Sequence, residues 1–210
     1  TIDRNNITTS GTTTNNAGML LLTRAGLNNI TNNLIKTHSV GSGGSGIIIQ
    51  TDSRHNVADS NNISTNGSAG SNLGIYLLTR ATSNNVTNNL INTSGTTTNY
   101  GIESVTNSDN NIILNNTINS GGSTSDNYGI YFSNIVFNNN ATHNRVYARG
   151  TSTNEGIRLQ NAANGSIIEY NNITTNGTTT GNRGVYVLTS TLNNITNNLI
   201  ITNGTSGNEG

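Results

Sequence analysis

The sequence has no cysteine, no proline and no tryptophan, and aromatic residues make up only 4% of its 210 positions. Without cysteine the chain has neither disulfides nor thiolate ligands for a metal. Without proline every residue can donate a backbone hydrogen bond, which suits strands that have neighbours on both sides. Hydrophobic residues reach only 30%, which is low for an ordinary globular domain. We therefore do not expect a thick, compact core.

Charge is also scarce, and it is balanced. Nine basic residues offset nine acidic ones, and Lys36 is the single lysine. Nucleic-acid binding needs Lys and Arg to replace counterions at phosphates, and no such excess exists here. No apolar run approaches the ~18 residues that cross a bilayer. The composition indicates neither a nucleic-acid partner nor insertion into a membrane.

What the chain does have is a repeat of 27 or 28 residues. An asparagine stands two residues before an apolar β-former eight times, at Asn5, Asn33, Asn61, Asn89, Asn116, Asn144, Asn171 and Asn198. A second asparagine series, broken at Gly44, comprises Asn16, Asn72, Asn99, Asn127, Asn154, Asn182 and Asn208. A glycine follows two residues after each member of the second series, as at Gly74 and Gly101. A period of this length with strand-like content predicts stacked units that bury their apolar faces against one another.

Each repeat carries three short apolar stretches joined by Asn, Gly, Ser and Thr. The first follows the repeat glycine, as at Ile75 and Leu77, and the last is the Asn-x-Ile motif. In the middle stretch we expect the inward residues to be Ile30, Val57, Val86, Ile112, Ala141, Ile167 and Ile195. Small residues, such as Thr65, follow two positions after the ladder isoleucine and suit an inner corner. Three strands per coil, stacked about 4.8 Å apart, predict a parallel β-solenoid of about 7.5 coils.

The Asn-x-Ile series and the repeat glycines resemble the right-handed parallel β-helix repeats of the pectate-lyase-like superfamily. The resemblance covers residues 1–210 and implies a single all-β domain, a right-handed parallel β-helix with inward-pointing asparagine ladders. An amide side chain both donates and accepts, so a column of asparagines can hydrogen-bond along the axis. We therefore interpret both asparagine series as structural, and the chain as a segment of a longer repetitive protein.

Catalysis is not indicated by the acidic residues. Lyases of this superfamily use clustered Asp residues, and its glycosidases use two or three carboxylates a few ångströms apart. Here the carboxylates are scattered over different registers, and the densest cluster is Asp52, Arg54, His55 and Asp59. Two columns instead alternate in sign along the axis, which predicts ion-pair ladders: Arg24, Asp52 and Arg80, and Glu155, Arg183 and Glu209. We expect no enzyme activity, no cofactor and no metal.

One column has an unusual composition for a solvent face. It lies two residues after the repeat glycine and includes Tyr76, Tyr131, Arg158 and Tyr186. An outward apolar stripe marks an interface, either with another copy or with another part of the same chain. Aromatic rings on a solenoid face also stack on sugars, so carbohydrate is the second candidate partner.

Asn-x-Ser/Thr sequons are about as frequent as the composition predicts by chance. For a secreted chain, Asn66, Asn176 and Asn203 are the strongest candidates for glycosylation, in turns that follow strands.

Together these observations predict a structural β-solenoid rod, outside the cell or on its surface, that acts as a fibre, stalk or adhesin segment through reach and self-association. The alternative is a polysaccharide-binding or polysaccharide-cleaving β-helix whose active site lies outside this segment.

Overall fold

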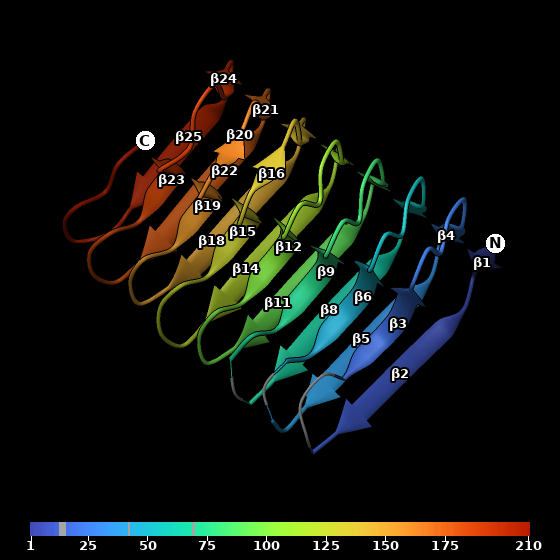
Figure 1. The fold of residues 1–210 in the computed structure, drawn as a ribbon. Coiled ribbons are helices and arrows are strands. Elements are labelled where there is room, and N and C mark those ends of the chain that lie inside the picture. The colour runs from blue at the N-terminus through green and yellow to red at the C-terminus, as the bar shows by residue number, and fades with distance from the viewer. Residues whose placement is uncertain (13–15, 42, 69) are drawn as a thin grey trace.

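The computed structural model describes residues 1–12, 16–41, 43–68 and 70–210. The chain winds into a parallel β-solenoid of about seven coils (Figure 1). The described residues contain strands and turns but no helix. The structure confirms the all-β repeat fold expected from the 27- or 28-residue spacing.

Three sheets run along the axis, and each is made of equivalent strands from successive coils. The first sheet contains β1 (Ile2–Asp3), β4 (Asn29–Thr31), β7 (Val57–Asp59), β10 (Asn85–Thr87), β13 (Ile112–Leu114), β17 (Asn140–Thr142), β21 (Ile167–Glu169) and β24 (Asn194–Thr196). The second contains β2 (Asn6–Gly11), β5 (Leu34–Ser39), β8 (Asn62–Gly67), β11 (Leu90–Gly95), β14 (Thr117–Gly122), β18 (Arg145–Gly150), β22 (Asn172–Gly177) and β25 (Leu199–Asn203). The third contains β3 (Ala17–Leu22), β6 (Ser45–Gln50), β9 (Leu73–Leu78), β12 (Tyr100–Val105), β15 (Tyr128–Ser133), β19 (Glu155–Gln160) and β23 (Arg183–Leu188). A short fourth pair joins β16 (Val136–Phe137) to β20 (Ala163–Asn164).

The first asparagine ladder is continuous and uses its hydrogen bonds fully. Asn89 Oδ1 accepts from Asn61 N at 2.9 Å and from Asn61 Nδ2 at 3.0 Å. The same Asn61 Nδ2 also donates to the carbonyl of Ile30, one coil back, at 2.9 Å. This pattern repeats along the column, so each amide satisfies a backbone N–H and a carbonyl of the preceding coil and also bonds to the asparagine side chain of the following coil, as at Asn89. The predicted structural role of this ladder is confirmed.

The second ladder is present and is interrupted where expected. Side-chain amides bond from Asn72 to Asn99 at 2.9 Å and onward to Asn208. Asn16 lies beyond the break at Gly44, and its Nδ2 donates instead to Ser39 Oγ at 3.0 Å.

A third ladder was not predicted. It runs through Asn28, Asn56, Asn84, Asn111 and Asn139, with the same backbone and side-chain bonds as the first as far as Asn111. In the last step Asn111 N donates to Asn139 Oδ1 at 2.9 Å. Ser166 takes the next position and Asn193 the one after it, where its Oδ1 accepts from Ser166 N at 2.8 Å.

Each ladder stands directly after a sharp corner of the backbone. The preceding residue adopts the left-handed conformation, with φ of 55° at Asn88, 55° at Ser83 and 57° at Thr98. These residues come before Asn89, Asn84 and Asn99, one for each ladder. Because non-glycine residues rarely adopt this conformation, the ladder bonds at the next residue compensate for its strain.

The repeat glycines are explained by a close approach of the third sheet to the second. A methyl group on Gly101 would overlap Ile118 Cγ2 and would lie 2.6 Å from the carbonyl oxygen of Gly129. The equivalent glycines of neighbouring coils meet the equivalent β-branched residues in the same way, Ile91 at Gly74 and Val146 at Gly129. A side chain at these positions would overlap its neighbours, and glycine is the residue that fits.

The core is a narrow column of aliphatic side chains. Ile35, Ile63, Ile91 and Ile118 stack in register on the second sheet, and all are fully buried. The middle stretch departs from prediction at three positions, because Ala58, Ile113 and Ile168 are buried where Val57, Ile112 and Ile167 were expected. In these coils two apolar residues are adjacent, so apolarity alone does not give the register. The third asparagine ladder does, since each buried residue lies two positions after it.

The small-residue column after the ladder isoleucine points inward, as expected. Thr37, Thr65, Thr93 and Thr175 are buried there, and Ala148 takes the same position in another coil. The threonine hydroxyls have no hydrogen-bond partner within the described chain. These positions therefore require a side chain of small size and suitable shape, and not a hydrogen-bonding group.

Coil length varies mainly in one turn, between the second and third sheets. Eleven residues separate Asn61 from Asn72, but ten separate Asn89 from Asn99. From the third ladder to the first, by contrast, the spacing is always five, as from Asn84 to Asn89.

Candidate functional site

The outer face of the third sheet holds most of the aromatic and buried charged side chains. Two outward columns cross it, each formed by register partners in successive strands. The first outer column is Ala17, Ser45, Leu73, Tyr100, Tyr128, Glu155 and Arg183. The second outer column is Leu20, Ile48, Tyr76, Glu103, Tyr131, Arg158 and Tyr186. Along the axis this face changes from aliphatic through aromatic to ionic.

The predicted stripe of Tyr76, Tyr131, Arg158 and Tyr186 lies in the second outer column. These four side chains are half-buried, and Arg158 lies over the rings of Tyr131 and Tyr186. The role of the stripe as an interface stays a prediction.

An aromatic cluster occupies the middle of the face. The rings of Tyr100 and Tyr128 stack with centroids 4.8 Å apart and planes 7° apart. Tyr131 meets both edge-on, at 5.3 Å and 5.4 Å. Tyr100 and Tyr128 were not predicted as part of this surface, because their column has no constant residue type. The signal was their spacing of 28 residues, directly before the repeat glycines.

Arg158 joins this cluster to the ionic part of the face. Its guanidinium carbon lies 5.0 Å from the ring centroid of Tyr128 and 5.2 Å from that of Tyr186. Arg158 Nη1 also donates to Glu155 at 2.8 Å and to the Tyr128 hydroxyl at 3.0 Å. With its Nε on Gln160 at 2.6 Å, Arg158 is held in place and serves to brace three coils.

The ion-pair ladder of Glu155, Arg183 and Glu209 is confirmed. Arg183 pairs with Glu155 at 3.2 Å and with Glu209 at 2.6 Å. Glu155 is fully buried, and its burial raises the pKa of that carboxyl against the opposing effect of Arg158 and Arg183. Removal of either arginine would leave this buried charge poorly compensated.

The other predicted ladder forms only in part. Asp52 pairs with Arg80 at 2.6 Å and with Arg54 of its own coil at 3.6 Å, while Arg24 forms no ion pair among the described residues. Hydrogen bonding to Arg80 lowers the pKa of Asp52 to about 2. Asp59 does not join Asp52 and Arg54 in this ion-pair group. Its carboxylate accepts hydrogen bonds from Thr87 and Asn88 instead. These exposed pairs contribute little stability.

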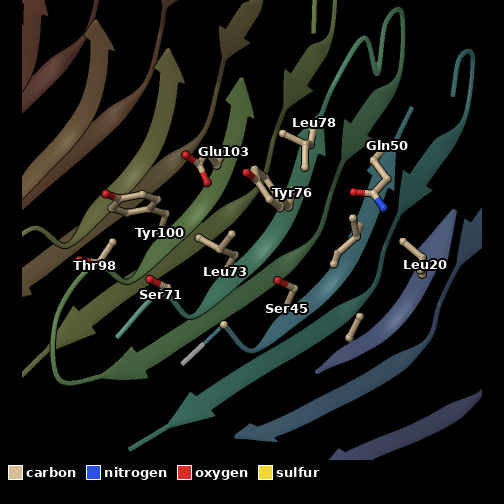
Figure 2. Close-up of a pocket in the computed structure, with 13 residues that line it drawn as sticks. Leu20, Ser45, Gln50, Ser71, Leu73, Tyr76, Leu78, Thr98, Tyr100 and Glu103 are labelled. Carbon is tan, nitrogen blue, oxygen red and sulfur yellow. The ribbon is translucent and has the colours of Figure 1, made fainter. Parts of the chain in front are cut away.

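A groove of about 590 Å³ lies on the amino-terminal half of the third sheet, across β3, β6, β9 and β12 (Figure 2). It is lined by Ala17, Leu20, Gly43, Ser45, Ile48, Gln50, Ser71, Leu73, Tyr76, Leu78, Thr98, Tyr100 and Glu103. The residues come from both outer columns, from the turns between the second and third sheets, and from the last positions of β6 and β9, Gln50 and Leu78. The lining is mostly aliphatic and aromatic, with a few uncharged polar groups.

Glu103 is the acidic residue of the groove, between Tyr76 and Tyr131 in the second outer column. Burial raises the pKa of its carboxyl to about 7. Burial also raises the pKa of the Tyr76 hydroxyl, to which the nearby Glu103 charge contributes. Near neutral pH this carboxyl can therefore both donate and accept hydrogen bonds.

The predicted glycosylation sites Asn66, Asn176 and Asn203 are exposed. They lie inside β8, β22 and β25 and not in turns. This corrects the predicted placement, because each of these strands of the second sheet continues to or beyond its sequon asparagine. Their modification stays a prediction.

Two general features bear on the kind of site present. No group of three or more His, Asp or Glu residues in the described part of the chain is placed to hold a metal ion. Within the same residues, no helix is long and apolar enough to cross a membrane. Comparison with known proteins finds no family model and no curated protein that matches this chain.

Proposed function

We propose that this chain is a section of a non-catalytic structural rod, outside the cell or on its surface. Its function depends on the length of the rod and on the addition of further coils along its axis. Those coils belong either to the same polypeptide or to a second copy. Antibody labelling of intact cells tests the location, and an exclusively intracellular signal would contradict it.

The polarity of the first asparagine ladder is the observation that carries the proposal. In each step, N and Nδ2 of one asparagine donate to Oδ1 of the asparagine in the following coil, as from Asn171 to Asn198 at 2.9 and 3.0 Å. The last coil therefore offers donors at Asn198, and the first offers the acceptor Oδ1 of Asn5. The two ends are complementary, which favours head-to-tail stacking. Such contacts do not close on themselves and generate filaments.

The terminal coils also expose residues of the core column. Ile195 is 38% exposed, whereas its register partner Ile168 is fully buried. At the other end, Ile2 is 36% exposed and its partner Ile30 is buried. Covering such side chains with another coil yields about 25 cal/mol per Å² of apolar surface, and it pairs the open strand edges.

Electron microscopy and sedimentation of the 210-residue chain test the proposal. We expect filaments with an axial repeat of roughly 38 Å, which is eight strand spacings of ~4.8 Å. Ile195→Lys with Ile200→Lys places charge on the stacking end and should abolish them. Leu192→Lys, at an outward corner that is 88% exposed, is the matched control and should leave them intact. A stable 22.0 kDa monomer for the unmodified chain would overturn the head-to-tail stacking of copies.

The non-catalytic part of the proposal has its own test. Incubation with pectate, polygalacturonate or alginate, with and without calcium, should release no unsaturated or reducing ends. Turnover that Asp52→Asn or Asp59→Asn abolishes would contradict it.

A further inference from the structure

We propose that the groove on the third sheet binds an uncharged oligosaccharide, with sugar rings on its apolar floor and sugar hydroxyls on its polar groups. This site is distinct from the stacking ends, and binding at it does not depend on filament formation.

The floor is formed by neighbouring side chains of the second outer column. Leu20 is 50% exposed, while Ile48 and Tyr76 are half-buried beside it on the next two strands. They follow one another at the strand spacing of ~4.8 Å. A tyrosine presents an apolar ring and a polar tip, and such a surface suits the mixed CH and OH faces of a sugar ring.

The polar groups of the groove are uncharged hydroxyls and an amide. Ser45, Ser71 and Thr98 contribute hydroxyls on the side of the turns, and Gln50 contributes its amide near the far end of β6 (Figure 2). Hydroxyl and amide groups both donate and accept, as a sugar hydroxyl does. A few placed polar groups on an otherwise apolar lining is the usual composition of a small-ligand site.

The charge of the groove selects against acidic ligands. None of the described residues that line it is Lys or Arg, and Glu103 is its acidic group. A uronate or sulfated sugar would find no cation there and would meet the Glu103 carboxylate once that group ionises. Arg158, the nearest cation of the face, is occupied by Glu155, Gln160 and Tyr128.

The size of the groove favours an oligosaccharide over a protein partner. Its volume of about 590 Å³ falls within the ≈ 300–1,000 Å³ typical of small-molecule sites. A stable protein interface needs about 800 Å² from each partner, which is a broader surface than thirteen groove residues offer.

Titration calorimetry with the full 210-residue chain tests the proposal. The probes are cellohexaose, mannohexaose and xylohexaose, with hexagalacturonate as the acidic comparison, at pH 8. At least one neutral hexasaccharide should bind saturably, and hexagalacturonate at least tenfold more weakly. Tyr76→Ala should weaken neutral binding at least tenfold, and Gln50→Ala should weaken it measurably without removing an aromatic side chain. Tyr147→Ala, on β18 of the second sheet, is the control and should bind as the unmodified chain does.

Three outcomes would overturn the proposal. One is the absence of binding by every neutral probe at millimolar concentration. Another is tighter binding of hexagalacturonate, and the third is unchanged binding by folded Tyr76→Ala and Gln50→Ala. A lateral dimer that Tyr76→Ala dissociates, without any sugar effect, would assign the face to a second copy instead.

Discussion

Asn89 Oδ1 accepts two hydrogen bonds from Asn61, one from the backbone N and one from Nδ2. Asn89 also donates to the carbonyl of Ala58 at 2.8 Å. A single amide thus satisfies three polar groups of the preceding coil.

Replacement of Asn89 by leucine should therefore destabilise the chain strongly. It leaves Asn61 N, one Asn61 Nδ2 hydrogen and Ala58 O without partners, at about 1–3 kcal/mol for each buried group. We expect the free energy of unfolding in urea to fall by at least about 3 kcal/mol. Asn5→Leu is the matched control, because no described residue donates to the side chain of Asn5, and it should cost less than about 1 kcal/mol. Equal losses would show that the ladder does not brace the coils.

The buried threonine column gives the opposite expectation. Thr65 is fully buried and its hydroxyl has no hydrogen-bond partner within the described residues. Thr65→Val keeps the shape and removes the desolvated hydroxyl, so we expect a gain of about 1 kcal/mol in stability. Thr65→Ser keeps the hydroxyl and loses a methyl group, and should cost about 1 kcal/mol. A higher melting temperature for Thr65→Ser than for Thr65→Val would contradict this expectation, because it would show that the hydroxyl has a hydrogen-bond partner.

Addition of one methyl group at the repeat glycine should disrupt packing. Gly101→Ala places the methyl group against the Ile118 side chain and the backbone carbonyl of Gly129. Neither a core side chain nor backbone can move aside easily. We expect a loss of about 3 kcal/mol in chemical unfolding. Gly26→Ala serves as the comparison, because Gly26 is exposed and its nearest neighbour would be 3.1 Å away. A Gly101→Ala variant as stable as Gly26→Ala would refute the close approach.

Glu103 should make stability depend on pH between about 4.5 and 7. Its pKa is raised from 4.5 to about 7 in the folded chain, so the folded state holds the proton over a range in which the unfolded state has released it. Stability therefore falls as pH rises through this window. Glu103→Gln should flatten the decline in melting temperature from pH 5 to pH 8. Asp52→Asn, which removes a carboxyl with a lowered pKa, should change the slope of melting temperature against pH only in acid, below about pH 4. An unchanged slope in Glu103→Gln would contradict the burial of this carboxyl.

The sequence predicted the coil because its constraints recur at fixed residues. Asn89 and Gly101 have counterparts in neighbouring coils, and each occupies a position where the contacts allow only one residue type. The third ladder was equally visible at Asn56 and Asn84, and its recognition would have corrected the register at Val57. The groove was not predictable in the same way, because Leu73, Tyr100 and Glu155 share one register but differ in every property. What such a face binds depends on the mixture of side chains across coils, and a periodic pattern does not encode it.

The one turn in which coil length mainly varies also forms an edge of the groove, through Gly43, Ser71 and Thr98. Residues can be gained or lost there without shifting any strand of the first or second sheet by even one position. A peptide inserted between Thr124 and Ser125 should thus project sideways from an unchanged rod. Successive coils would present such inserts at intervals of ~4.8 Å along the axis, so loops inserted at this edge would be regularly spaced. Changes in these turns alone, made in one coil at a time, would therefore alter which ligands the outer face of the third sheet prefers.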